Sequence, residues 1–121
     1  MIKFHNLNKE RPYLLFKSKY NDALNSDEKN IEAISVSSFN TKMNEVDSRF
    51  VNLKFIENDK FIFFSNYKSP KALSFRSHNQ ITALLYWSSI NVQIRIKATI
   101  SKTSDEYNQN YFFNRSEENS A

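Results

Sequence analysis

The chain has 121 residues, of which 40% are hydrophobic, 15% aromatic and 25% charged, and its formal net charge is +4. This size and composition predict one folded domain and exclude a disordered chain or a second hydrophobic core. The absence of cysteine excludes disulfides and thiolate chemistry, and the presence of only two histidines argues against a histidine-rich metal site. The absence of glycine excludes glycine-rich phosphate loops and leaves positive-φ turns to Asn and Asp.

No apolar run reaches the roughly 18 residues of a membrane span, and Met1–His5 lacks the apolar core of a secretory signal. We therefore expect a cytoplasmic protein without a membrane partner. The basic excess suits an anionic partner, whether a nucleic acid, a membrane surface or a phosphorylated small molecule, and charge alone does not choose between them.

The first half of the chain predicts one helix followed by strands. Residues 1–10 are polar and irregular, and the apolar spacing after Pro12 predicts a helix over residues 12–25. Strands are predicted from residue 31 and over residues 49–56, with a polar stretch at 40–47 between them. Residues 57–60 predict a tight hairpin turn that leads into an antiparallel strand over 61–66.

The second half predicts a short helix after Ser69, a strand over 81–87 and a long strand over 90–100, where apolar and polar residues alternate. A capping box at residues 103–106 predicts a last helix, on which Tyr107, Tyr111 and Arg115 share one face. The expected fold is mainly β with peripheral helices, as an antiparallel barrel or a strongly curved sheet.

A candidate anion site lies where the strand ending near residue 66 runs into Ser69-Pro70-Lys71. Ser69 suits the N-cap, Pro70 suits the first helical position, and Lys71 adds a cation at the positive helix end, a combination that favours a phosphate monoester. The alternative is that these residues only start a helix.

Three further pairs of side chains suit an anionic or planar ligand. Arg49 and Lys54 are five residues apart, so they share a face of one strand only through a bulge, or serve one ligand at an edge or subunit interface. Gln93 and Arg95 point away from the apolar face of the long strand. Each pair equally suits a solvated surface.

Tyr111 and Arg115, one helical turn apart, offer a phenol and a guanidinium to a phosphate, or else pack on one another. The sequence shows no hydrolytic triad and no paired-carboxylate signature, so any redox chemistry would be carried by a cofactor.

Six stretches taken together resemble the pyridoxamine 5'-phosphate oxidase family, whose members are flavoproteins of the FMN-binding split-barrel fold. Their order and spacing along the chain agree with the family pattern. The stretches are PYLLFKSKYNDAL, NIEAISVSS, RFVNLK, FIFFSNYKSPKA, LLYWSSINVQIRI and YFFNR.

The resemblance implies one antiparallel split-barrel domain over residues 1–121 that binds FMN at the interface of a homodimer. It also implies oxidation of pyridoxamine or pyridoxine 5'-phosphate to pyridoxal 5'-phosphate, with O2 as the electron acceptor and H2O2 as product. The implied FMN contacts are Arg49, Val51, Lys54, Phe64, Ser65, Ser69, Lys71 and Gln93. The implied contacts to the phosphorylated B6 substrate are Lys54, Tyr111 and Arg115.

The sequence departs from the family pattern at three places. Pro70 stands where the family usually has Arg, and Asn119 stands at a substrate-phosphate serine, with Ser120 adjacent. The family continues with a C-terminal segment that carries further flavin and substrate contacts, and we expect this segment to be absent. Two alternatives therefore remain: a non-catalytic or truncated FMN-binding split barrel, and a small basic barrel that binds nucleic acid. The polar face of the long strand lacks the aromatic residues that the last alternative needs, so we expect no nucleic-acid partner.

Overall fold

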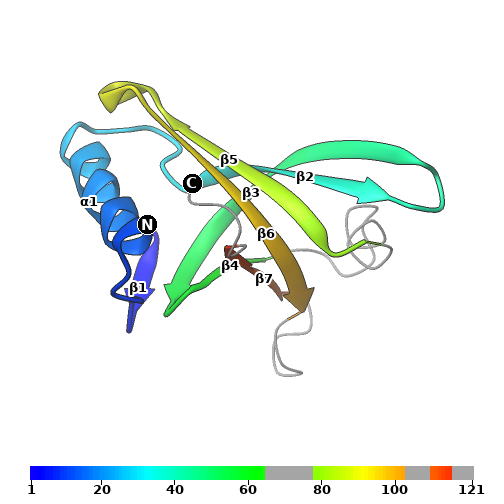
Figure 1. Cartoon of the computed structure of the whole chain (residues 1–121). Helices are drawn as coiled ribbons and strands as arrows, with labels where there is room; N and C mark the ends of the chain where they lie inside the picture. Colours follow the sequence, from blue (N-terminus) through cyan, green and yellow to red (C-terminus); the bar gives the residue numbers. More distant parts are fainter. Residues whose placement is uncertain (65–77, 103–109, 116–121) are drawn as a thin grey trace.

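The computed structural model describes residues 1–64, 78–102 and 110–115 (Figure 1). The order of elements is β1 (Lys3–His5), α1 (Arg11–Asn25), β2 (Ala33–Asn40), β3 (Glu45–Glu57), β4 (Lys60–Phe64), β5 (Gln80–Trp87), a 3-10 turn (Ser88–Ile90), β6 (Val92–Lys102) and β7 (Asn110–Arg115). No helix in these ranges is long and apolar enough to cross a membrane.

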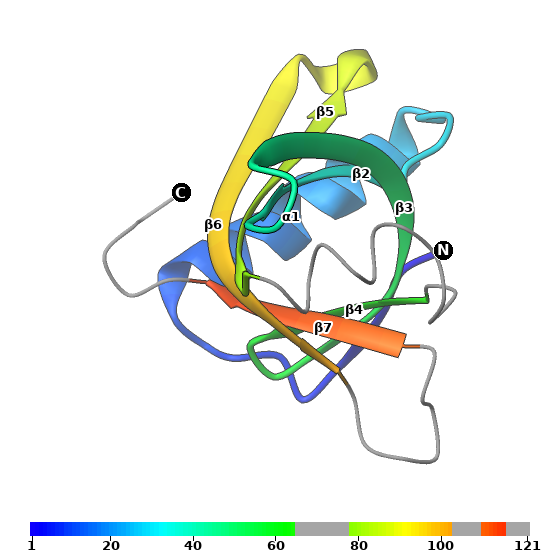
Figure 2. The ribbon, with the colours of Figure 1, turned by 90° about the vertical axis from the view of Figure 1, so that its right-hand side faces the viewer.

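The strands form one seven-stranded sheet in the order β1-β3-β2-β5-β6-β7-β4, and β4 also pairs with β3. Because β4 pairs with both β3 and β7, the antiparallel strands β2 to β7 close into a ring, which Figure 2 shows end-on. The short β1 adds to β3 in parallel outside this ring. The expected antiparallel barrel is therefore confirmed, and closure removes exposed sheet edges from most of the ring.

Alternating side chains fill the barrel and explain why these segments are strands. On β6, Ile96, Ala98 and Ile100 are buried while Lys97 and Thr99 between them are exposed. The predicted core face and wet face of the long strand are thus confirmed.

An aromatic cluster joins α1 to the barrel. The ring of Phe16 meets those of Phe61 and Trp87 edge-on, each with 5.5 Å between centroids. Phe61 in turn stacks on Phe113 of β7 at 5.1 Å. The Trp87 indole donates a hydrogen bond to the Ile31 carbonyl at 3.0 Å. The buried face of α1 therefore covers one part of the barrel and fixes the chain segment that enters β2.

The turns use Asn and Asp as the absence of glycine requires. Every described residue with a positive φ is Asn or Asp: Asn6, Asp27, Asn30, Asn44, Asn58 and Asn91. Asn44 and Asn58 lie in the two turns that flank β3, and Asn91 precedes β6. These side chains tolerate the left-handed conformation better than other non-glycine residues do.

Four expectations are corrected by the structure. Residues 110–115 form strand β7 and not a helix, because Phe113 must point into the barrel and the backbone pairs with both β4 and β6. Residues 3–5 form β1 and are not irregular. Only residues 41–44 of the polar stretch at 40–47 form a turn, because β2 and β3 continue through Asn40 and from Glu45 as a long hairpin beyond the barrel. Ile90 belongs to the turn before β6.

The remaining expectations are confirmed where the structure describes them. The first helix, the antiparallel pairing of β3 with β4 and the strand over 81–87 all form within a residue or two of their expected bounds. The short helix predicted after Ser69 and the capping box at 103–106 lie outside the described residues.

We expect Tyr20→Phe to lower the free energy of unfolding by about 1 to 2 kcal/mol. The buried Tyr20 hydroxyl accepts a hydrogen bond from the Ile2 backbone N–H at 2.8 Å, and phenylalanine would leave that buried N–H unpaired. Urea unfolding followed by the fluorescence of Trp87, the chain's single tryptophan, measures the change. Tyr86→Phe is the control, because Tyr86 is exposed and its loss should cost less than about 0.5 kcal/mol. Equal effects of the two substitutions would contradict the assignment.

Candidate functional site

Arg49 lies on the inner face of β3, near one end of the barrel. It pairs across strands with the buried Val36, which pairs with the buried Ala83 of β5. The Arg49 guanidinium donates to the Ser38 hydroxyl at 2.7 Å and to the Val36 carbonyl at 3.2 Å. These bonds hold a half-buried cation in a fixed place at the end of the core.

Burial lowers the pKa of the Arg49 guanidinium, and the carboxylate of Asp47 acts in the opposite direction. An arginine nevertheless remains charged at neutral pH. A half-buried guanidinium of this kind is well suited to hold an anion, since less of its charge is screened by water.

A β-bulge turns Lys54 toward the same face of β3 as Arg49. The pairing of β3 with β4 shifts between Leu53 and Phe55, so Lys54 is the extra residue. Before the bulge the buried residues of β3 are Val51 and Leu53, at odd positions, and after it the buried residue is Ile56, at an even position. Lys54 lies two residues before Ile56 and is half-buried. The bulge that the spacing of Arg49 and Lys54 required is therefore present, and both cations share the inner side of β3.

Val51 is buried in the core between these two cations and pairs with Ile34 of β2. Any contact from Val51 to a ligand would therefore come through its backbone or from the barrel end, and its side chain mainly packs the core.

The segment after β4 carries the expected phosphate contacts. Phe64 ends β4, and its backbone pairs with Asn110, the first residue of β7. Ser65, Ser69 and Lys71 lie outside the described residues. Their joint role in binding a phosphate stays a prediction.

Tyr111 and Arg115 lie on strand β7, so the expected helical pairing is wrong. Tyr111 pairs with Phe63 of β4, while Arg115 pairs with Ala98 of β6. Four residues span about 13 Å along a strand and about 6 Å along a helix. The backbone of β7 therefore holds the two residues about twice as far apart as one helical turn would.

Gln93 is exposed on the outer face of β6, where it pairs with the exposed Tyr86. Arg49 belongs to the inner face of the sheet. The residues paired with it in turn across β2, β5 and β6 are Val36, Ala83 and Ile96, and all three are buried. Within one chain, therefore, the structure puts Arg49 and Lys54 on the same side of β3, five residues apart, and leaves Gln93 on the opposite side of the sheet.

Ser38 is the functional side chain that sequence reasoning missed. It is only 3% exposed and hydrogen-bonds the Arg49 guanidinium. A signal was present, since Ser38 follows Ile34 and Val36 at the same two-residue spacing and so had to point inward. A buried hydroxyl at the end of a core strand calls for a polar partner.

Among the described residues, no group of three His, Asp or Glu side chains is placed to hold a metal ion. The donors described at the site are instead the cations Arg49 and Lys54 of β3 and the hydroxyl of Ser38 on β2, a set whose chemistry suits phosphate better than a metal ion.

Several known proteins are similar to this chain in sequence. No protein-family model matches the chain. A pyridoxine/pyridoxamine 5'-phosphate oxidase from Rhodopirellula baltica is 33% identical over 111 residues, which cover 88% of this chain and 48% of that protein. The chain spans about half the length of the curated relatives that it matches.

Two solved structures share the fold. PhzG from Burkholderia lata, solved with tetrahydrophenazine-1-carboxylic acid, superimposes with a TM-score of 0.72 at 20% identity over 79% of this chain and 47% of PhzG. A pyridoxamine 5'-phosphate oxidase-related FMN-binding protein from Nostoc punctiforme gives a TM-score of 0.64 at 14% identity over 74% of this chain and 48% of that protein.

The relatives in sequence and the neighbours in structure agree with each other and with the motifs on β3, β4 and β6. Together they show that this chain has the split-barrel fold and that its sequence is similar to about half the length of pyridoxine/pyridoxamine 5'-phosphate oxidases.

Proposed function

We propose that this chain binds FMN and catalyses the oxidation of pyridoxamine or pyridoxine 5'-phosphate to pyridoxal 5'-phosphate. The observation that carries the proposal is the bulge in β3, which puts Lys54 on the same inner side as the anchored guanidinium of Arg49. Two half-buried cations on one side of a strand suit a cofactor and a substrate that both carry phosphate.

The residues of the chain fit FMN in their chemistry. Arg49 and Lys71 would balance the phosphate charge, Ser65 and Ser69 would offer hydroxyl donors, and Gln93 would offer an amide to the polar edge of the ring. Phe64 and the backbone of Val51 would line the flavin. When bound, FMN supplies a two-electron acceptor that O2 reoxidises, with H2O2 as product.

The substrate would be held through its own phosphate. Lys54 would lie next to both ligands, with Tyr111 and Arg115 of β7 contributing further donors. Because β7 sets these two residues about 13 Å apart along the strand, they would engage different atoms of the substrate or be bridged by it.

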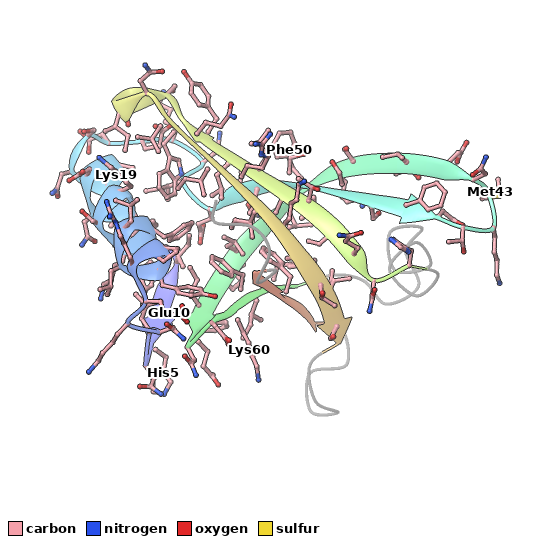
Figure 3. The ribbon with its side chains drawn as sticks, in the orientation of Figure 1. His5, Glu10, Lys19, Met43, Phe50 and Lys60 are labelled. Carbon is pink, nitrogen blue, oxygen red and sulfur yellow. The ribbon has the colours of Figure 1, made fainter. Side chains whose placement is uncertain are left out.

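A second copy of the chain would complete the site. The outer face of β3, β2, β5 and β6 carries a row of paired residues that runs from Phe50 through Ser35 and Leu84 to Arg95. Phe50 is 75% exposed (Figure 3). Tyr86, two residues after Leu84 and therefore on the same face, is 58% exposed. An apolar face of this kind favours contact with another protein surface, and a homodimer would bring the partner's Gln93 toward Arg49.

The purified protein is expected to bind FMN and to form pyridoxal 5'-phosphate and H2O2 from pyridoxine 5'-phosphate and O2. Riboflavin should bind at least about tenfold more weakly than FMN, because it lacks the phosphate that the cations recognise. Flavin fluorescence measures both affinities, and absorbance of the aldehyde product measures turnover. Flavin binding without turnover would reduce the function to flavin binding, and a protein that takes up no FMN would exclude both functions.

Arg49→Gln should lower the affinity for FMN by about tenfold or more, and Ser38→Ala should lower it by a smaller factor. The hydroxyl of Ser38 touches the guanidinium and so orients it, whereas Arg49 itself is expected to meet the phosphate. Ser37→Ala is the matched control, because the Ser37 hydroxyl lies on the outer face and hydrogen-bonds the exposed Ser48 hydroxyl. If Ser37→Ala and Arg49→Gln weaken FMN binding equally, Arg49 has no special role.

Phe50→Asp should convert a dimer into a monomer and lower FMN affinity at the same time, since a charge would be buried in the proposed contact. Light scattering after size-exclusion chromatography measures the mass, and flavin fluorescence measures the affinity. Leu14→Asp on the exposed side of α1 is the control and should change neither quantity. A wild-type protein that is monomeric and still binds FMN would contradict the shared site.

A further inference from the structure

A groove separates α1 from the first half of β6. Its volume is about 430 Å³, in the lower part of the range for small-molecule sites. Residues on one face of α1, at the helical spacing of Pro12, Leu15, Phe16 and Lys19, form one wall. Residues 92–96 of β6 form the other wall, and the aromatic rings of Tyr13 and Phe61 lie at its floor.

The groove exists because β7 covers only part of β6. β7 pairs with residues 98–102 of β6, and within the described residues no strand pairs with positions 92–97 on that edge. Helix α1 lies beside this stretch in place of a strand (Figure 1). Helix α1 and strand β4 pack through Phe16 and Phe61 at the floor, while the more exposed Leu15 of α1 and Ile94 of β6 line the upper walls.

Two cations and an amide surround this apolar interior. Lys19 is half-buried on α1, and Arg95 and Gln93 are exposed on β6. The described lining residues include no carboxylate. Across the described ranges, neither Lys19 nor Arg95 forms an ion pair or a hydrogen bond. Within the part of the chain that the structure describes, the positive charge at the groove therefore has no acidic partner.

We infer that this groove binds a small aromatic carboxylate. The apolar walls would bury the flat ring, and Lys19 and Arg95 would hold the carboxylate, for which a guanidinium provides two parallel donors. A neutral ligand would leave both cations uncompensated, and a highly charged ligand would gain nothing from Leu15 and Ile94. Gln93 is also a proposed flavin contact and Arg95 lies on the proposed dimer face, but the groove takes no residue from the inner side of β3 and its test does not require oxidase activity.

The inference is tested with 2-naphthoate as the probe and its neutral amide, 2-naphthamide, as the matched ligand. Calorimetry and NMR titration of the full chain are expected to show saturable binding of one naphthoate, with shifts confined to α1 and residues 92–96. The amide should bind at least about tenfold more weakly, because it lacks the charge. Equal binding of acid and amide, or shifts elsewhere in the protein, would overturn the inference.

Substitutions then locate the contacts. Lys19→Gln and Arg95→Gln should each weaken naphthoate binding about three- to tenfold. Leu15→Glu should abolish it by placing a like charge in the groove, and the protein should remain folded because Leu15 is 48% exposed. Lys17→Gln is the control on the same helix, since Lys17 lies outside the groove with its ammonium 5.3 Å from the Phe4 ring centre. If Lys17→Gln weakens binding as much as Lys19→Gln, general charge attraction explains the result.

A final experiment separates the groove from the flavin site. Naphthoate affinity is measured with and without saturating FMN. Independent binding of the two ligands supports a separate site. Competition between them would show that the groove is part of the flavin site and would overturn the inference, whatever the outcome for oxidase activity.

Discussion

The rest of the structure depends on the double pairing of β4. This five-residue strand bonds to β3 on one edge and to β7 on the other, and so converts a curved sheet into a closed barrel. Its alternate residues Phe61 and Phe63 fill the interior against Phe113 of β7. Without β4, the core aromatics of β7 and α1 would lose their common partner, and the edges of β3 and β7 would be open to other chains.

The same strand creates the candidate site. The buried apolar residues of β3 change from odd to even positions at Lys54. β3 can therefore keep these residues buried while it pairs with β4 only if one residue is left out of the pairing. The bulge thus serves packing and function together: it keeps Leu53 and Ile56 inside and brings Lys54 onto the side where Ser38 anchors Arg49. Polar groups at the end of the inner face make one opening of the barrel polar. A phosphate can be held at such an opening without entering the apolar core.

Local patterns in the sequence predicted most of this fold. Alternation in β6, the Asn and Asp turn before β4 and the apolar spacing of α1 each reflect a preference of the segment itself. The failures occurred where distant partners decide. Residues 110–115 follow a capping box and have helix-compatible spacing, yet two neighbouring strands and the buried position of Phe113 make them β7. Lys3–His5 is a strand only because the last residues of β3 extend past the end of β2, and β1 pairs with the edge of β3 that is left open there. For the candidate site, spacing alone required a bulge between Arg49 and Lys54, whereas the link from Arg49 to Ser38 needed the register of β2 on β3.

The sheet geometry also couples the proposed cofactor site to the proposed dimer. In a single chain, Arg49 faces the barrel interior and Gln93 faces outward, so one flavin can meet both only if they come from different copies. Exposed Phe50 and Tyr86 lie on the same outer face as Gln93, so one apolar contact would bury that face and complete the site. Under this proposal FMN binds the dimer more tightly than the monomer, and by linkage FMN stabilises the dimer by the same factor. The affinity for flavin would then rise with protein concentration, which is not expected for a site contained in one barrel.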